Sequence, residues 1–358
     1  MKIDHVHFYV EDAKVWRDWF VHHLGFQAVA DRISSFHTCT EVVESGTVCF
    51  FLSSPLLPTS PVAEFLRQYP PGVADVAFAV EDVETAIALA EKHGATILQP
   101  IQERQIGTAF LKCGKIAAWG GLTHTLIERS LVSGHSSLVF DKGQMTNDNT
   151  FTAIDHVVLN VAVGELERAV AWYENILDFQ PQQAFKIKTD RSGLHSQVMV
   201  SRNGSVQLPI NEPASSNSQI QEFLDVNRGA GIQHIALRTT NLVSAIAKFR
   251  ASGLSLLSVP QTYYSQLKQR PGLTLSALEL EAIAQQEILV DWQEYTPLEA
   301  RQTAPLLLQI FTQPIFEQPT FFFEFIERRF QAKGFGEGNF RALFEAIESE
   351  QIKRGTLQ

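Results

Sequence analysis

The chain has 358 residues, of which 45% are hydrophobic and 19% are charged, as in ordinary globular proteins, which argues against disorder and low-complexity sequence. At roughly 150 residues per domain, this length predicts two domains or one large one. The 39 acidic residues outnumber the 29 basic ones and give a formal charge of −10. This charge argues against a nucleic-acid partner, because proteins that bind phosphate backbones usually present a basic face.

Cysteine usage and apolar segments indicate the cellular compartment. The three cysteines, Cys39, Cys49 and Cys113, are an odd number without metal-ligand spacing, so we expect neither a disulfide framework nor a zinc ribbon. The first residues do not resemble a signal peptide, and no run of about 18 apolar residues is present. We therefore expect a cytoplasmic protein that makes no membrane contact.

Comparison of the chain with itself shows an internal repeat. The matched segments are Ile3–Val6 with Ile154–Val157, Gly72–Phe78 with Gly231–Leu237, and Thr125–Arg129 with Glu324–Arg328. Two halves, each made of two similar modules, explain this pattern. A polar stretch without apolar periodicity separates them, so we expect an N-terminal structural domain over 1–132, a linker over 133–150 and a catalytic domain over 151–358.

Each module reads as a strand, an amphipathic helix and then further strands. Residues 5–10 have the length and apolar content of a strand, and apolar side chains at helical spacing predict a helix over 13–24. The same helical pattern recurs over 240–253, where Gly253 provides a left-handed end. A terminal helix is predicted over 339–353, beginning at the N-cap residue Asn339. The pattern indicates an α+β protein.

The two halves differ at three matched strand positions. The first half has His5, Asp75 and Thr125, where the second has His156, His234 and Glu324. Two histidines and one carboxylate form the set that holds non-haem Fe(II) on one face and leaves positions open for substrate and O₂. Threonine cannot replace a carboxylate ligand, so we expect the first half to be free of metal.

Glu324 carries the strongest single argument for a metal. All its neighbours in Phe321–Ile326 are apolar or aromatic, and a buried carboxylate without a partner is costly. A cation is therefore expected, either a metal or an arginine, unless the carboxylate lies at an exposed edge. Taken alone, His156 and His234 would more commonly be hydrogen-bonded core or rim residues, but their matched places in the repeat favour a metal role.

At these residues the sequence resembles the 4-hydroxyphenylpyruvate dioxygenase family, two-domain members of the vicinal oxygen chelate superfamily. The segments that carry the resemblance are Ile154–Val157, Ser192–Ser196, Leu208–Pro213, Ser218–Gln221, Gly229–His234, Leu307–Phe311 and Gly334–Phe340. The resemblance implies two βαβββ modules per domain, which form open β-barrels, and a terminal helix that acts as a lid.

The resemblance also implies roles for individual residues. One Fe(II) per chain would be held by His156, His234 and Glu324, with O₂ as co-substrate. The polar groups acting on the substrate would be Ser196, Asn211, Gln233 and Gln309, and the residues binding it would be Gln219, Phe311, Phe322, Phe335 and Phe340. Without the resemblance, the polar residues could simply be solvated or lie in turns. His195 stands where many members have asparagine, which leaves the hydrogen bonds around Ser196 open.

The activity implied by the resemblance is that of a non-haem Fe(II) dioxygenase acting on a 2-oxo acid. It converts 4-hydroxyphenylpyruvate and O₂ to homogentisate and CO₂ by oxidative decarboxylation, ring hydroxylation and side-chain migration. The alternatives are a 4-hydroxymandelate synthase on the same scaffold and a non-catalytic binding protein of the same superfamily. Whether homogentisate would enter tyrosine breakdown or prenylquinone synthesis stays open. The paired modules make a homo-oligomer plausible.

Overall fold

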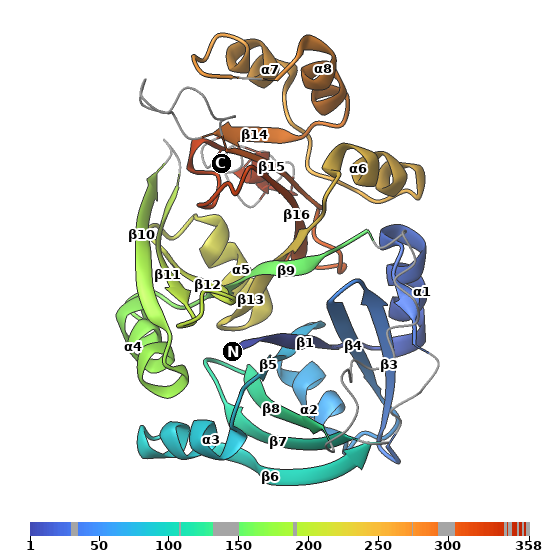
Figure 1. The fold of residues 1–358 in the computed structure, drawn as a ribbon, viewed down its shortest axis with the longest axis vertical. Coiled ribbons are helices and arrows are strands. Elements are labelled where there is room, and N and C mark those ends of the chain that lie inside the picture. The colour runs from blue at the N-terminus through green and yellow to red at the C-terminus, as the bar shows by residue number, and fades with distance from the viewer. Residues whose placement is uncertain are drawn as a thin grey trace.

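The structure is a computed structural model in which every residue of the chain is present. It describes residues 1–29, 35–106, 109–131, 150–188, 192–273, 275–292, 305–339, 342, 346–348, 351–352 and 354–355. The described strands form two eight-stranded curled sheets, one in each half of the chain (Figure 1). Some helices pack on the outer faces of these half-barrels, whereas the helix over Gln219–Asn227 lines a pocket in the second one. The superfamily fold expected from the resemblance is confirmed.

The first half has strands β1 to β8 and helices α1 to α3. Their bounds are β1 Lys2–Tyr9, α1 Ala13–Leu24, β2 Gln27–Ala28, β3 Thr38–Ser45, β4 Val48–Pro55, α2 Pro61–Gln68, β5 Gly72–Ala79, α3 Val83–Lys92, β6 Ile97–Ile106, β7 Ala109–Ala117 and β8 Thr123–Leu131.

The second half repeats this order and adds two helices before its last three strands. Its elements are β9 Ala153–Asn160, α4 Leu166–Leu177, β10 Gln180–Lys188, β11 Gly193–Val200, β12 Gln207–Pro213, α5 Gln219–Asn227, β13 Gly231–Arg238, α6 Leu242–Ala251, α7 Gln261–Leu267, α8 Ala277–Gln285, β14 Leu289–Trp292, β15 Leu306–Phe311, β16 Phe322–Arg329 and the 3₁₀ turn Glu337–Asn339.

The strand order shows the two modules of each half directly. In the first sheet the modules meet where β1 pairs antiparallel with β5, and β4 and β8 flank this pair in parallel. In the second sheet β9 and β13 meet in the same way, flanked by β12 and β16. Each module is therefore a βαβββ unit, as expected. The division into domains at 132 and 151 stays a prediction.

The predicted helices agree with the structure where it describes them. The helix predicted over 13–24 is α1, and α6 lies inside the range 240–253, with Gly253 at a φ of 81°. Helices α2, α5, α7 and α8 were not predicted. Residues 133–149 of the predicted linker over 133–150 lie outside the described residues, and so does most of the predicted terminal helix, although residues 346–348 are helical.

Strand β16 joins the site to the core because its side chains alternate between the two faces of the sheet. Phe323 and Phe325 point away from the site: Phe323 stacks on Phe50 of the first half at a ring-centroid distance of 5.8 Å, and Phe325 stacks on Phe151, just before β9, at 5.7 Å. Phe322 and Glu324 face the interior of the second half-barrel. The apolar residues around Glu324 thus lie in two different environments, the core and the interior of the second half-barrel.

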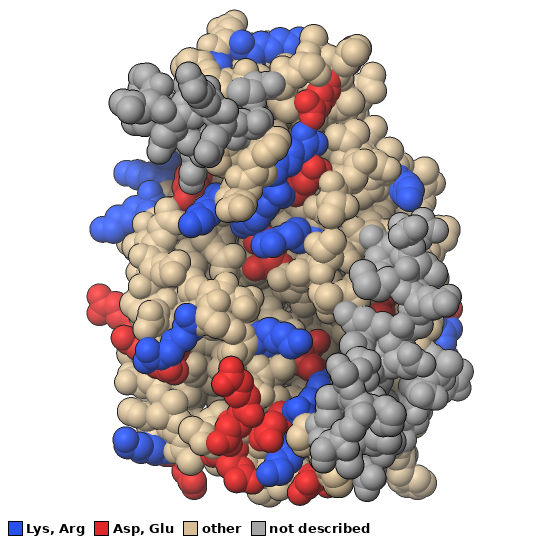
Figure 2. Space-filling model, in the orientation of Figure 1, with Lys and Arg blue, Asp and Glu red and all other residues tan. Residues whose placement is uncertain are grey.

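Surface properties agree with the composition. Figure 2 shows basic side chains interspersed with acidic ones on one face of the molecule, and acidic side chains gather toward the lower half of that view. Among the described residues, no helix has the length and apolar content needed to cross a bilayer. The three cysteines are free thiols.

Candidate active site

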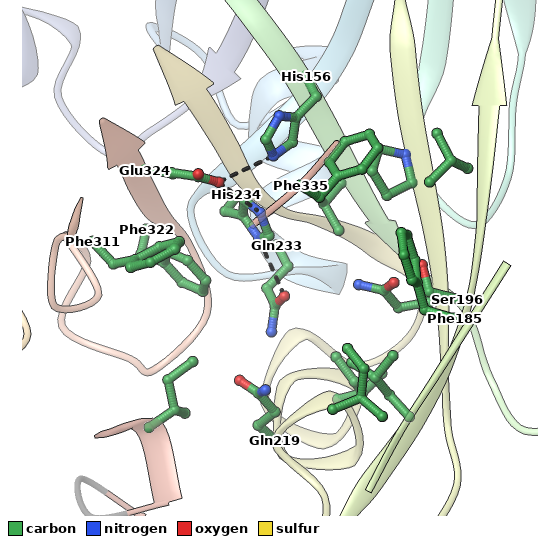
Figure 3. Close-up of a pocket in the computed structure, with 18 of the residues that line it drawn as sticks. His156, Phe185, Ser196, Gln219, Gln233, His234, Phe311, Phe322, Glu324 and Phe335 are labelled. Carbon is green, nitrogen blue, oxygen red and sulfur yellow. Dashed lines mark hydrogen bonds and ion pairs between the residues drawn. The ribbon is translucent and has the colours of Figure 1, made fainter. Parts of the chain in front are cut away.

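Three side chains from three neighbouring strands meet inside the second half-barrel. His156 lies on β9, His234 on β13 and Glu324 on β16, and one ligand atom from each lies within 4.8 Å of the others (Figure 3). Nε2 of His156 is 3.1 Å from Oε2 of Glu324, and Nε2 of His234 is 3.8 Å from the same oxygen. Metal–ligand bonds of about 2.1 Å place neighbouring ligand atoms roughly 3 Å apart, so this set needs only a small contraction around an ion.

The strand register explains why these residues converge. Ala236 on β13 is paired with His156 on one side and with Glu324 on the other. Paired residues project from the same face of a sheet, and His234 lies two positions from Ala236 and so shares that face. A register shift between Ile232 and His234 marks a bulge. Bulges can re-aim side chains, and both Gln233 and His234 face the pocket.

The charges of the site fit a metal ion. Glu324 is 2% exposed, and the described residues place no Lys or Arg in an ion pair with it; its ion pairs are to the two histidines. The arginine alternative is therefore not supported. Burial lowers the pKa of His156, but the carboxylates of Glu324 and Asp155 more than offset it and raise that pKa to about 9. The site therefore favours a positive charge between His156 and Glu324. Two imidazoles with one carboxylate are a ligand set that suits Fe(II).

His234 is held mainly by ring contacts. It stacks on Phe322 with ring centroids 4.8 Å apart and an interplanar angle of 17°, and its Nδ1 lies 3.4 Å from Oε1 of Gln233. Burial and the neighbouring His156 hold the pKa of His234 well below its ordinary value. A neutral imidazole is the form that binds a metal.

A pocket opens directly beside the triad (Figure 3). Counted out to its open mouth, it holds about 660 Å³, a size typical of small-molecule sites. Ser196, Asn211, Gln219 and Gln233 supply polar groups to its wall, and the described part of the chain also contributes the predicted residues Gln309, Phe311, Phe322 and Phe335. Gln219 begins helix α5 and is 7% exposed, so it is not in a solvated loop.

The described pocket lining includes neither His195 nor Phe340. His195 does not line the pocket; its side chain is 44% exposed, and its Nδ1 lies 3.9 Å from Glu212. It alternates with Leu194 and Ser196, both of which face inward, so its departure from the family pattern lies on the outer face of β11. Phe340 lies outside the described residues, and its place in the wall stays a prediction.

The structure adds pocket residues that sequence reasoning missed. Phe185 on β10 lies against Phe335, with ring centroids 6.1 Å apart, and Phe335 lies against His156 at 5.1 Å. Ile347, from the terminal segment, also lines the pocket. Phe185 lies in the strand that precedes the Ser192–Ser196 motif, and alternation along that strand was the only available signal.

The corresponding place in the first half is occupied by protein groups. The Nζ atom of Lys115 lies 2.9 Å from Asp75, which also accepts hydrogen bonds from the hydroxyls of Thr123 and Thr125 at 2.6 and 2.8 Å. Burial alone would raise the pKa of Asp75, but Lys115 and the hydroxyl of Thr123 lower it. The contacts satisfy this carboxylate without an ion, which supports the prediction of a metal-free half.

Comparisons with known proteins identify the family of the chain. The model of the Glyoxalase/Bleomycin resistance protein/Dioxygenase superfamily matches residues 2–112 and 153–270. The 4-hydroxyphenylpyruvate dioxygenase of Coccidioides posadasii is 38% identical over 389 residues, which cover 99% of this chain and 94% of that protein. That of Caenorhabditis briggsae is 38% identical over 378 residues, 99% and 93% of the two chains.

This chain belongs to the 4-hydroxyphenylpyruvate dioxygenase family. Among solved structures, a triple mutant of 4-hydroxymandelate synthase from Streptomyces coelicolor matches with a TM-score of 0.82 at 25% identity, and the match covers 98% of each chain. The scaffold of this dioxygenase family is thus similar to that of an enzyme named for a different product.

Proposed function

We propose that the chain converts 4-hydroxyphenylpyruvate and O₂ to homogentisate and CO₂, with one Fe(II) held by His156, His234 and Glu324. One observation carries the proposal: the triad opens onto a pocket that combines amide and hydroxyl groups with phenyl rings. An aromatic 2-oxo acid with a phenol hydroxyl has chemistry complementary to both kinds of group. Full-length relatives that are 38% identical carry the same enzyme name.

The reaction balances without an external reductant. The 2-oxo acid loses its carboxylate as CO₂, one oxygen atom of O₂ enters the new carboxylate, and the other becomes the ring hydroxyl. When bound, Fe(II) supplies coordination positions for the 2-oxo acid and O₂ and the electrons that start O₂ reduction.

The polar side chains bind and orient the substrate. Gln219 and Gln233 enter the pocket from α5 and β13, and Ser196 from β11 (Figure 3). We assign these side chains to hydrogen bonds with the phenol hydroxyl and the 2-oxo acid of the substrate. Because they are fixed on regular elements, they lose little conformational entropy when they position the substrate. Asn211 is itself oriented by Asn160, whose Oδ1 accepts a hydrogen bond from it at 3.3 Å.

The phenyl rings form an apolar wall near the metal site. Phe311 and Phe322 lie on one side of the triad and Phe335 on the other (Figure 3). Their role is to hold the substrate ring and to exclude water from the reacting centre, which prevents side reactions.

The test is aerobic incubation of Fe(II)-loaded protein with 4-hydroxyphenylpyruvate, with O₂ uptake recorded and the product identified by chromatography. Homogentisate supports the proposal. 4-Hydroxymandelate would move the oxidation to the side chain and identify a synthase on this scaffold. Iron binding without O₂ uptake would contradict both activities and favour a binding role.

We further propose that the protein works in the cytoplasm as a homo-oligomer, with domain limits at 132 and 151. The free thiols support a reducing compartment. Phe36 and Leu278, which are 83% and 80% exposed in the single chain, are apolar groups that a second copy could cover. Light scattering after size-exclusion chromatography gives the mass; a monomer at micromolar concentration would contradict the oligomer.

A further inference from the structure

Asp155 precedes the ligand His156, and its side chain is completely buried. Its Oδ1 accepts hydrogen bonds from Nδ1 of His156 at 3.0 Å and from Nη2 of Arg328 at 2.7 Å. Its Oδ2 accepts from Nε of Arg328 at 2.8 Å and from Nε and Nη2 of Arg238 at 2.9 and 2.6 Å. Two guanidinium groups thus fix the carboxylate, and the carboxylate in turn contacts the imidazole.

We propose that Asp155, fixed by Arg238 and Arg328, is a positioning residue that sets the ring orientation and tautomer of His156 for metal binding. The inference rests on the metal site of the proposed function. Because Nδ1 donates its proton to Asp155, Nε2 is the atom left to face Glu324, 3.1 Å away. A carboxylate behind a metal-bound imidazole fixes the ring and strengthens it as a ligand.

The internal repeat shows which part of this arrangement is specific to the metal-binding half. In the first half, Nδ1 of His5 lies 2.9 Å from Oδ1 of Asp4, and Arg129 donates to Asp4 at 2.8 Å. The pair of contacts is therefore common to both halves. Arg238 has no matching arginine in the first half. It pairs with Ala153 in the second sheet, and the matching pair in the first sheet is Ala79 with Lys2, so alanine takes the place of Arg238. Among the described residues, a second guanidinium lies only beside the carboxylate that serves the triad.

Arg328 extends the arrangement toward the pocket. Its Nη1 donates to the carbonyl oxygens of Ala332 at 3.2 Å and Gly334 at 2.9 Å. Gly334 precedes Phe335, whose ring lies against His156. The same guanidinium thus fixes the carboxylate behind the ligand and the backbone of the segment in front of it.

The experiment measures Co(II) affinity of the metal-free protein by competition with a chromophoric chelator, together with the visible spectrum of bound Co(II). Loss of such outer partners typically weakens metal binding roughly 10- to 100-fold. We expect Asp155→Asn to fall in that range with a changed spectrum. Arg238→Gln, at a residue whose side chain is 41% exposed, should weaken binding roughly tenfold and keeps the test valid if Asp155→Asn does not fold.

Asp4→Asn is the matched control, because it makes the same change in the half that has no triad. It should leave both affinity and spectrum as in the wild type. Wild-type binding by Arg238→Gln, or equal weakening by Asp4→Asn, would overturn the positioning role. Glu324→Ala distinguishes a wrong metal site from a wrong role for Asp155. If Glu324→Ala binds Co(II) like the wild type, the proposed metal site is wrong. If Glu324→Ala loses Co(II) binding while Arg238→Gln binds normally, only the role of Asp155 is contradicted.

Discussion

Gln309 donates a hydrogen bond of 2.8 Å from its amide to Oε1 of Glu324. The same nitrogen donates to the carbonyl oxygen of Phe335 at 3.0 Å, and Oε1 of Gln309 accepts from Asn339. The amide is therefore committed to Glu324 of the triad and to the segment that contributes Phe335 to the pocket wall. This arrangement favours a positioning role for Gln309 over the direct substrate contact that the family resemblance implies.

Replacing Gln309 by leucine should lower kcat roughly tenfold or more and weaken iron binding, while KM changes less. A hydrogen bond to a charged group contributes about 1.5–3 kcal/mol, and about 1.4 kcal/mol corresponds to tenfold in rate. Steady-state kinetics and iron titration measure the effect. Gln180→Leu, on the exposed side of β10, is the control. A large rise in KM at constant kcat would instead indicate a direct substrate contact.

Glu324→Ala should abolish both stoichiometric iron binding and turnover, because it removes the single carboxylate of the triad. The equivalent residue in the first half is Thr125, and Thr125→Ala should retain one iron per chain. Colorimetric iron content of reconstituted protein measures both. A Glu324→Ala protein that keeps iron and activity would refute the ligand assignment.

Phe335→Ala should uncouple O₂ consumption from product formation, because it removes the ring that lies 5.1 Å from the ring of His156 and admits water beside the metal site. We expect more O₂ consumed than homogentisate formed. An oxygen electrode combined with chromatography gives the ratio. Phe36→Ala, at a side chain that is 83% exposed, should keep the wild-type ratio, and equal ratios in both variants would contradict the water-excluding role.

The internal repeat predicted that His156, His234 and Glu324 would lie together, because identical strand registers place matched residues at the same point of each sheet. It could not predict Phe185 or Ile347, which enter the pocket from a neighbouring strand and from the terminal segment without any motif. Helices α7 and α8 interrupt the last module and have no counterpart in the first half. Asp155 accepts a hydrogen bond from Arg238, 83 residues away in the chain, and no local sequence pattern predicts such a contact.

His124 predicts a pH dependence of stability. Its ring lies between the carbonyl oxygen of Val76 at 2.9 Å and the hydroxyl of Tyr173, in the other half, at 3.0 Å. Burial lowers its pKa from 6.5 to about 4. Between these values the unfolded chain binds a proton that the folded chain does not, so the contribution of His124 is fully present above pH 6.5 and declines as the pH falls toward 4.

The loss through this group should be about 1.4 kcal/mol at pH 5.5 relative to pH 7.5. In His124→Gln that part of the pH dependence is absent, so the difference in unfolding free energy between wild type and variant should shrink by the same amount at pH 5.5. Urea unfolding at both values measures it. A difference independent of pH would mean that His124 binds its proton equally in the folded and unfolded chains.

Strand β16 has one further consequence. The side chains that alternate with Glu324 are Phe323 and Phe325, and they rest on Phe50 and Phe151. Through Phe50, the first half therefore helps to fix the position of the strand that carries Glu324. A change of volume at Phe50, in the half without the triad, would therefore be transmitted through one stacked ring to the backbone that carries Glu324.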